Sequence, residues 1–453
     1  MKVTRFSHRL RPTIVVMESS KGCEGRPRTE FPSPSVSIMG KRRSGQAGIL
    51  LALLGTSIGS VACDSAAQSG PRTETRDSAG ITIVENFGEL GPEVAAWTVG
   101  PDPLLSIGSF EGDSLYQLFR VRGAARLDDG RLAVVNAGSG EVRIYDESGQ
   151  YLMSHGRKGE GPGEFESPAL AGVLGPDTLV IVDTQLRRIS LVQAGVGFLR
   201  SARLEDEIGG GAYPQGIFAD GTVLLGGGFY WSSDSGAELR DGYTRQATSY
   251  QSSTMDGGLA TEFGEFPGSE FFMQVRQSGG AVSMSARLIP FGKHAMATVA
   301  PDRMYFGSGD SWEIQGYGLD GRLNHLIRLD RDLLPVTGDL VAAHTREQEA
   351  DAVDEAQARE IRQGIEEMPI PDFLPAFASL YSDKVEHLWV ERSRGPGDPP
   401  PTFDVFNPQG ALVGLVNLPA DLSVLEIGDD YLLGLFRDEL EVEYLRLYPL
   451  SRH

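Results

Sequence analysis

Cysteine is almost absent from this sequence. Of 453 residues only two are cysteines, Cys23 and Cys63, and both precede the part of the chain that is predicted to fold. The remainder therefore contains no disulfide and no cysteine-ligated metal site. A body without thiols is compatible with an oxidising compartment.

Familiar catalytic motifs are also missing. No His-Glu-x-x-His occurs, and the histidines after Cys63 are scattered, at positions 155, 294, 325, 344, 387 and 453. Gly-x-Ser-x-Gly occurs once, at 55–59, inside an apolar segment rather than between a strand and a helix. The glycines at 159–163 lack the Lys-Ser/Thr pair of a phosphate loop. The sequence thus offers no catalytic residue, and no metal ligand that spacing identifies.

Basic residues become scarce after the first segment. Residues 1–62 contain 10 Lys and Arg against 3 Asp and Glu, whereas residues 63–453 contain 31 against 59. An acidic surface repels the phosphates of nucleic acids and of anionic lipids, so no nucleic-acid partner is expected. No catalytic cofactor is expected either. If a metal binds, the acidity favours a structural Ca²⁺ held by carboxylates or carbonyls.

The apolar run at 47–58 is too short to remain in a membrane, because a spanning helix needs roughly 20 residues. It follows the basic stretch 39–43 and precedes small residues, which is the order of a secretory signal peptide. We predict a signal peptide over residues 39–62. Since such signals begin at the initiating methionine, we predict that translation starts at Met39 and that residues 1–38 are a non-native upstream extension.

Residues 60–63, Ser-Val-Ala-Cys, resemble the lipobox at which bacterial lipoproteins are cleaved and acylated. The match departs from the usual pattern at Ser60, where Leu is common. It implies lipidation of Cys63 and contact with a membrane only through that anchor. The alternative is ordinary cleavage after Ala62 or Ala67. Residues 63–78 have the composition of a flexible tether. The chain is accordingly expected to be exported, periplasmic or in the outer envelope, and lipid-anchored.

The chain after residue 78 contains an internal repeat of short apolar strands and Asp/Gly turns. In the clearest copy, 121–165, a turn at 128–130 precedes a buried strand, and residues 141–146 alternate with period two. Comparable turns recur near positions 129, 177, 220, 302, 386 and 430. Spacings of about 45 residues match one four-stranded blade. We predict an all-β protein, a six-bladed β-propeller of four-stranded antiparallel blades, as a single domain over residues 79–453.

Two further predictions concern the ends and the insertions. The last copy lacks its outer strand, and an open edge is a pairing hazard. We therefore expect residues 81–85 or 103–107 to pair with the strand around 444–448 and close the last blade. Residues 338–368 contain good helix formers, with Thr337 or Asp339 as the cap. We predict a short helical insertion, within about 338–378, that is either a solvated lid or a cover over the channel mouth.

The first two copies resemble NHL repeats. The residues that carry the resemblance are Leu132–Asn136, Arg143-Ile144-Tyr145-Asp146, the Gly-rich phrase 156–165, Val182-Asp183, Arg188-Ile189 and Gly197-Phe198. With Asp77-Ser78-Ala79-Gly80-Ile81 and the ending 431–439, the chain over about 77–450 resembles bacterial six-bladed β-propeller lipoproteins of NHL-repeat-like type. The resemblance implies the fold and an envelope location, and it implies no reaction.

Polar residues at the predicted strand ends are candidates for a ligand site at the channel rim. They are Asn136, Asp183, Arg187, Arg188, Arg437 and Asp438. Asp183 has a simpler interpretation, because a local ion pair with Arg188 or a turn bond would fix the blade. Arg437 and Asp438 carry the same ambiguity, and both interpretations stay open.

Three classes of function are compatible with these features, and one of them is a sensor or structural protein that binds no small ligand. The leading hypothesis is a non-catalytic propeller module of the cell envelope that binds a small polar ligand or an envelope protein, because function resides in the loops of such scaffolds. The alternative is a propeller enzyme, of lyase or lactone hydrolase type, that uses a divalent metal in the central channel. A monomer is expected.

Overall fold

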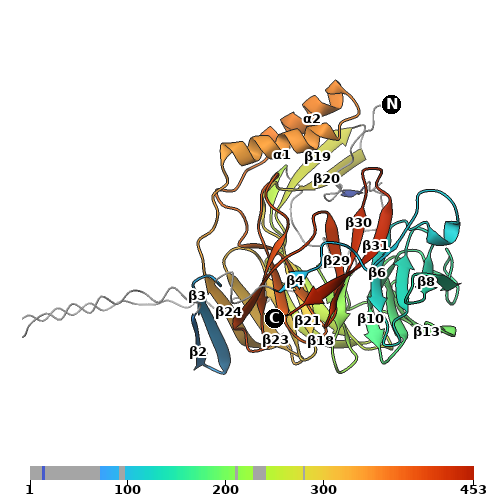
Figure 1. Cartoon of the computed structure of the whole chain (residues 1–453). Helices are drawn as coiled ribbons and strands as arrows, with labels where there is room; N and C mark the ends of the chain where they lie inside the picture. The colour runs from blue at the N-terminus through green and yellow to red at the C-terminus, as the bar shows by residue number, and fades with distance from the viewer. Residues whose placement is uncertain are drawn as a thin grey trace, which may run out of the picture.

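The computed structural model describes residues 13–15, 72–90, 97–209, 213–227, 241–278 and 281–452 (Figure 1). The described chain is all-β apart from two α-helices and a single 3₁₀ turn. Several of its sheets consist of four antiparallel strands that follow one another in the sequence. This is the arrangement typical of propeller blades. Cys63 and the predicted signal peptide lie outside the described residues, so both stay predictions.

The first two sheets have the simplest order. One contains β6 (Val121–Arg126), β7 (Leu132–Asn136), β8 (Glu141–Tyr145) and β9 (Tyr151–His155). The next contains β10 (Pro168–Leu174), β11 (Thr178–Asp183), β12 (Arg188–Gln193) and β13 (Gly197–Arg203). All five residues of β7 are buried, because this strand lies between β6 and β8 and is covered on both faces.

Two other sheets repeat this pattern with small changes. One contains β14 (Tyr213–Ile217), β15 (Val223–Gly226), β17 (Thr248–Ser253) and β18 (Leu259–Phe266). The other contains β25 (Phe377–Ser382), β26 (Leu388–Arg392), β27 (Thr402–Phe406) and β28 (Leu412–Asn417).

A fifth sheet is wider than the predicted four strands. It contains β21 (Met296–Ala300), β22 (Arg303–Gly307), β23 (Glu313–Gly318), β24 (Leu323–Asp330), β3 (Ile81–Phe87) and β2 (Arg72–Ser78). The strand β3 pairs with β24 in parallel and with β2 in antiparallel order. The structure therefore differs from the predicted tether over 72–78, which is a paired strand here.

The last sheet combines segments that lie far apart in the sequence. It contains β29 (Leu422–Ile427), β30 (Tyr431–Arg437), β31 (Glu443–Ser451), β4 (Thr98–Val99) and β5 (Leu105–Ile107). The register of β31 with β5 places Leu445 opposite Ile107 and Leu447 opposite Leu105. The prediction that residues 103–107 complete this sheet is confirmed, whereas residues 81–85 join β24 instead.

An insertion lies outside these sheets. A small sheet contains β1 (Thr13–Val15), β20 (Ala281–Leu288), β19 (Phe271–Ser278) and β16 (Gly242–Thr244). The predicted helical insertion is confirmed as α1 (Gly338–Ala350) and α2 (Glu355–Glu366). The hydroxyl of Thr337 accepts from the Leu340 N–H and caps α1. In Figure 1 both helices lie beside β19 and β20 at one end of the molecule.

The core clusters join the sheets into a closed circuit. Each cluster contains buried residues from two neighbouring sheets. In order, they connect β6–β9 to β10–β13, then to β14–β18, to β21–β24, to β25–β28, to β29–β31, and back to β6–β9. Because each of these six sheets buries both faces against its neighbours in the circuit, their apolar strands need no separate second layer.

The first strand of most sheets carries a β-bulge. Register shifts occur next to Gly123 in β6, Gly172 in β10 and Gly216 in β14, all at positive φ. A Cβ on Gly123 would lie 2.6 Å from the Cβ of Leu170, so glycine is needed where neighbouring first strands approach closely.

Candidate functional site

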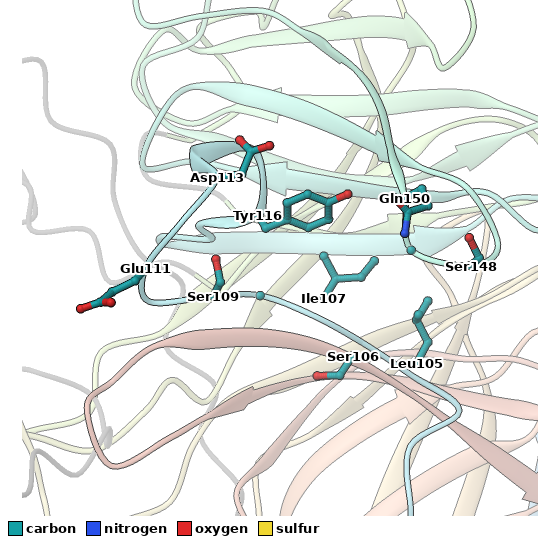
Figure 2. A pocket seen from close by; sticks show the side chains of 11 residues that line it. Leu105, Ser106, Ile107, Ser109, Glu111, Asp113, Tyr116, Ser148 and Gln150 are labelled. Carbon is teal, nitrogen blue, oxygen red and sulfur yellow. The ribbon is translucent and has the colours of Figure 1, made fainter.

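A pocket of about 400 Å³ lies where β5 and the chain after it meet a turn of the β6–β9 sheet (Figure 2). The 3₁₀ turn η1 (Ser114–Tyr116) forms part of its wall. The residues that line the pocket are Leu105, Ser106, Ile107, Gly108, Ser109, Glu111, Asp113, Tyr116, Ser148, Gly149 and Gln150.

One wall of the pocket is the chain that follows β5, which departs from the sheet at Gly108. Its φ is 152°, and a Cβ there would lie 2.5 Å from the carbonyl oxygen of Glu443. Only glycine fits this close approach to β31. The Ser109 N–H then donates to the Tyr116 carbonyl at 3.1 Å, which closes the loop between them.

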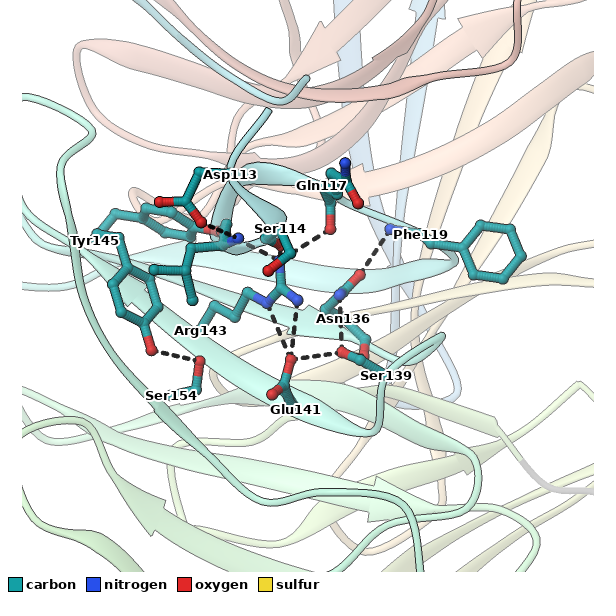
Figure 3. Close-up of polar contacts among 12 residues, drawn as sticks. Asp113, Ser114, Gln117, Phe119, Asn136, Ser139, Glu141, Arg143, Tyr145 and Ser154 are labelled. Atoms are coloured by element: carbon teal, nitrogen blue, oxygen red, sulfur yellow. Dashed lines mark hydrogen bonds and ion pairs between the residues drawn. The ribbon is translucent and has the colours of Figure 1, made fainter. Parts of the chain in front are cut away.

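Arg143 holds this loop from beneath (Figure 3). Its Nη1 donates to the carbonyls of Ser114, Leu115 and Gln117 at 3.0, 3.1 and 2.9 Å. The Glu141 carboxylate accepts from the same guanidinium at 2.9 Å. Arg143 is only 6% exposed. A buried cation with all these acceptors fixes the loop backbone in one position.

Tyr145 adds a second bond to the same loop. Its hydroxyl donates to the Leu115 carbonyl at 2.8 Å. Burial raises the pKa of Tyr145 to about 12, so the phenol keeps its proton and remains a donor at neutral pH. Asp113 caps η1, because its Oδ1 accepts from the Leu115 N–H at 3.0 Å.

The opposite wall is the turn between β8 and β9. The Oδ1 of Asp146 accepts from the N–H groups of Ser148 and Gln150 at 2.9 and 2.8 Å. These bonds, with that of the Ser148 hydroxyl first, lower the pKa of Asp146 below its ordinary value. Gly149 has a φ of 82° and its Cα faces Leu105, so the turn packs directly onto β5.

The polar groups of the pocket are hydroxyls, one amide and carboxylates. Glu111 and Asp113 are exposed and form no ion pair within the described ranges. The Tyr116 hydroxyl accepts from the Tyr151 N–H at 3.0 Å and keeps its own proton to donate. The buried Ser109 Oγ has no partner in the described part of the chain. With no Lys, Arg or His in the lining, the pocket disfavours an anion and suits a neutral or cationic ligand.

A second polar cluster joins three sheets. The Lys384 Nζ donates to the Arg126 carbonyl and the Tyr431 hydroxyl, both at 2.9 Å, and lies 3.1 Å from Glu426. Burial and the Glu426 carboxylate raise the pKa of Tyr431. Every charge in this cluster already has a partner, so it fastens β25, β29 and β6 together.

The sequence-predicted residues Asn136 and Asp183 bond to backbone inside their own sheets. The Asn136 Oδ1 accepts from the Phe119 N–H at 2.7 Å. The fully buried Asp183 carboxylate accepts from the N–H groups of four residues, Glu166, Ser167, Gln185 and Leu186. Among the described residues Asp183 forms turn bonds of the kind expected, and no ion pair with Arg188.

The predicted arginines also bind main-chain oxygens. Arg187 donates to the carbonyls of Glu205 and Ile208 at 3.0 and 2.8 Å. Arg188 donates to the carbonyls of Glu160, Gly161 and Glu164, which holds the Gly-rich phrase against β12.

In the last sheet the two remaining candidates are also occupied. Arg437 binds Glu443 at 2.8 Å. Asp438 accepts from the N–H groups of Leu440 and Val442 at 2.9 and 3.0 Å. The structure does not bring the predicted rim residues together into one site, and none of them lines the pocket. A ligand at the channel rim stays a prediction.

Sequence reasoning missed the pocket residues Ser109, Glu111, Asp113 and Tyr116. They belong to a segment that precedes the first repeat, so the repeat pattern gave no reason to single them out. Two residues that carry the resemblance to NHL repeats, Arg143 and Tyr145, could have indicated this segment. Their side chains bind this segment, and a search for the partners of that pair would have led to it.

Two features bear on metals and membranes. Within the described ranges no group of three or more His, Cys, Asp or Glu is placed to hold a metal ion. A structural Ca²⁺ and the metal-dependent enzyme alternative therefore stay predictions. No helix in the described part of the chain has the length and apolar character needed to cross a membrane.

Comparisons with known proteins found distant structural likenesses alone. No family model matches the chain, and no curated protein matches it. A Bacteroides fragilis protein described as exported is similar at a TM-score of 0.44 and 11% identity, covering 82% of this chain and 99% of its own. A member of the DUF4221 family from Bacteroides vulgatus is similar at 0.43 and 10%, covering 78% and 98%.

Virginiamycin B lyase from Staphylococcus aureus is similar at a TM-score of 0.36 and 9% identity, covering 80% of this chain and 96% of that one. Likenesses of this size carry no argument about the activity or location of the chain. The description of the fold above stands on its own sheets and core clusters.

Proposed function

We propose that this chain is a non-catalytic binding module whose pocket beside β5 accepts a small polar ligand that is not anionic. The observation that carries the proposal is the set of three carbonyl bonds from Arg143, which fix the pocket wall before any ligand arrives. A wall that is already ordered costs no further conformational entropy on binding. The lining supports the ligand class, since it contains two carboxylates and no basic side chain.

The proposed scaffold is a six-bladed propeller of NHL-repeat-like type. What supports it is the circuit of core clusters that returns from the β29–β31 sheet to the β6–β9 sheet. The strand β5 also supports this scaffold, because it precedes the β6–β9 sheet in the sequence and pairs with β31 of the last sheet.

The proposed location is the bacterial cell envelope, with export directed by residues 39–62 and an acyl anchor on Cys63. Its support is the order of basic, apolar and small residues in the sequence. Labelling cells with radioactive palmitate should mark the protein, and Cys63→Ser should abolish the label. If the protein is exported but takes up no palmitate, Cys63 is not lipidated and the signal peptide is removed by ordinary cleavage.

Calorimetric titration tests the ligand class. The probes are putrescine as a cation, maltose as a neutral polyol and glutarate as an anion. Putrescine should bind and glutarate should not, because the lining includes the carboxylates of Glu111 and Asp113 and no Lys, Arg or His.

The double variant Glu111→Gln/Asp113→Asn should weaken putrescine binding at least fivefold. Asparagine still caps η1, so the wall stays in place. Glu265→Gln, at an exposed position on β18, is the matched control and should leave binding unchanged. Binding of glutarate as tight as that of putrescine, or a double variant that binds normally, would refute the proposed site.

A further inference from the structure

The strand β2 is unusual because all seven of its residues are exposed. It pairs with β3 at every position from Arg72 opposite Phe87 to Ser78 opposite Ile81. It is the outermost strand of its sheet, and within the described ranges no strand pairs with its other edge. Figure 1 shows the β2–β3 hairpin at the periphery of the molecule. The N–H and C=O groups of that edge are thus available to another chain.

Several features that normally protect an edge strand are absent from β2. It contains no proline and no glycine, and its register with β3 has no bulge. Charge remains as the protecting feature, since β2 contains two arginines, one glutamate and one aspartate. Charge repels a second strand only where like charges meet, so the order of these residues along the strand decides which partner fits.

That order is self-complementary. If two copies of β2 run antiparallel about a two-fold axis through Thr75, Glu74 of each copy lies opposite Arg76 of the other. In the same register Arg72 faces Ser78, and Thr73 faces Asp77. No like charges lie opposite each other, and a pair of threonines meets on the axis, which is a favourable cross-strand pair.

The two neighbouring registers are disfavoured by charge. A two-fold axis normal to the sheet allows shifts of two residues, because side chains alternate between the faces. One such shift places Glu74 opposite Glu74 of the second copy, and the other places Arg76 opposite Arg76. Each is destabilising.

Glu74 has charged neighbours on both β2 and β3. It lies directly opposite Glu85 of β3. Its ion-pair partner among the described residues is Arg72 of its own strand, at 3.3 Å, with both side chains more than half exposed. Glu85 itself is paired with Arg76 and Arg328, each at 3.4 Å, so an arginine on the free edge would add a cation next to Glu74.

We propose that two copies of this chain pair edge to edge through β2, antiparallel about Thr75, so that one sheet runs through both. A C₂ arrangement of this kind buries the same strand of each copy and leaves no open edge to recruit a third. The pairing goes beyond the proposed ligand site, and it replaces the monomer expected from the sequence.

Cysteine cross-linking tests the register. Thr75→Cys should form a disulfide-linked dimer under mild oxidation on a non-reducing gel, because the two residues meet on the axis within the reach of a disulfide. Thr73→Cys is the matched control. Its counterpart lies four positions away along the strand, about 13 Å, which a disulfide does not span. The protein without either substitution controls for Cys63.

Charge reversal provides an independent readout in sedimentation equilibrium. Glu74→Arg or Arg76→Glu alone should raise the dimer dissociation constant at least tenfold, because each places like charges opposite. The combined Glu74→Arg/Arg76→Glu protein should recover dimerisation, with an unchanged thermal midpoint as evidence of folding. Three outcomes would each overturn the proposal: equal cross-linking at 73 and 75, a monomer at every concentration, or a double variant that does not dimerise again. If β2 pairs with a strand of another protein instead, this chain should be a monomer at every concentration.

Discussion

Replacing Arg143 with methionine should destabilise the protein by about 3–4 kcal/mol. The substitution keeps most of the aliphatic stem and removes the guanidinium, which donates to three loop carbonyls and to Glu141. Hydrogen bonds to a charged group contribute about 1.5–3 kcal/mol each. Ser114 and Gln117 are exposed, so water replaces part of what their carbonyls lose. The remaining cost is a large share of the roughly 5–15 kcal/mol by which domains are stable.

The assay is urea unfolding followed by tryptophan fluorescence, together with hydrogen exchange of the amides at 109–117. Arg143→Met should lower the free energy of unfolding by the stated amount and accelerate exchange in this segment. Arg157→Met is the control, because its side chain is 79% exposed and water screens its pair with Glu164, so its free energy of unfolding should stay close to that of the parent. If Arg143→Met unfolds within about 1 kcal/mol of the parent and residues 109–117 exchange as before, Arg143 does not hold the pocket wall.

Three further outcomes follow from buried groups. Asp183→Ala should lower the free energy of unfolding by about 3 kcal/mol in urea, because it leaves four N–H groups without their acceptor, and an unchanged midpoint would contradict this. Burial, aided by the charge of Arg303, lowers the pKa of His325 from 6.5 to about 4. The unfolded chain therefore takes up this proton first. Neutral His325 contributes its full stability above pH 6.5, and up to about 3 kcal/mol is lost as the pH falls towards 4. In His325→Gln the midpoint of urea unfolding should therefore depend less on pH between 6.5 and 4. A pH dependence as steep as that of the parent would contradict this. Ile107→Ala should lower the free energy of unfolding by about 3 kcal/mol, because Ile107 is buried where β5 pairs with β31. Leu104→Ala, at a 66% exposed position, should lower it by less than about 0.5 kcal/mol. Equal effects would mean that β5 does not complete its sheet.

The sequence predicted the parts of the fold that local pattern determines. Buried runs such as Leu132–Asn136 and the Asp/Gly turns identified the strands, and the missing outer strand correctly indicated pairing by residues 103–107. The strand β2 was missed because it has no apolar residue and no buried position, so no hydrophobic pattern marks it, and its pairing with β3 is what identifies it as a strand.

The candidate site was less predictable for a related reason. Asp183 and Arg188 were singled out as polar residues at strand ends, yet a strand end also needs acceptors and donors for its own turn. The pocket depends on the proximity of Glu111 and Gln150, which no local pattern encodes.

The last sheet is built from segments far apart in the sequence, and this determines when it can form during synthesis. The Val121 N–H binds the Glu443 carboxylate over 322 positions of sequence, and β5 waits for β31 in the same way. A ribosome finishes β5 long before its partner exists. In the nascent chain the edge of β5 therefore stays unpaired until β31 has been made, and loop closure over such a distance is slow. Completion of this sheet is consequently a late step, which can follow only after β31 has been made.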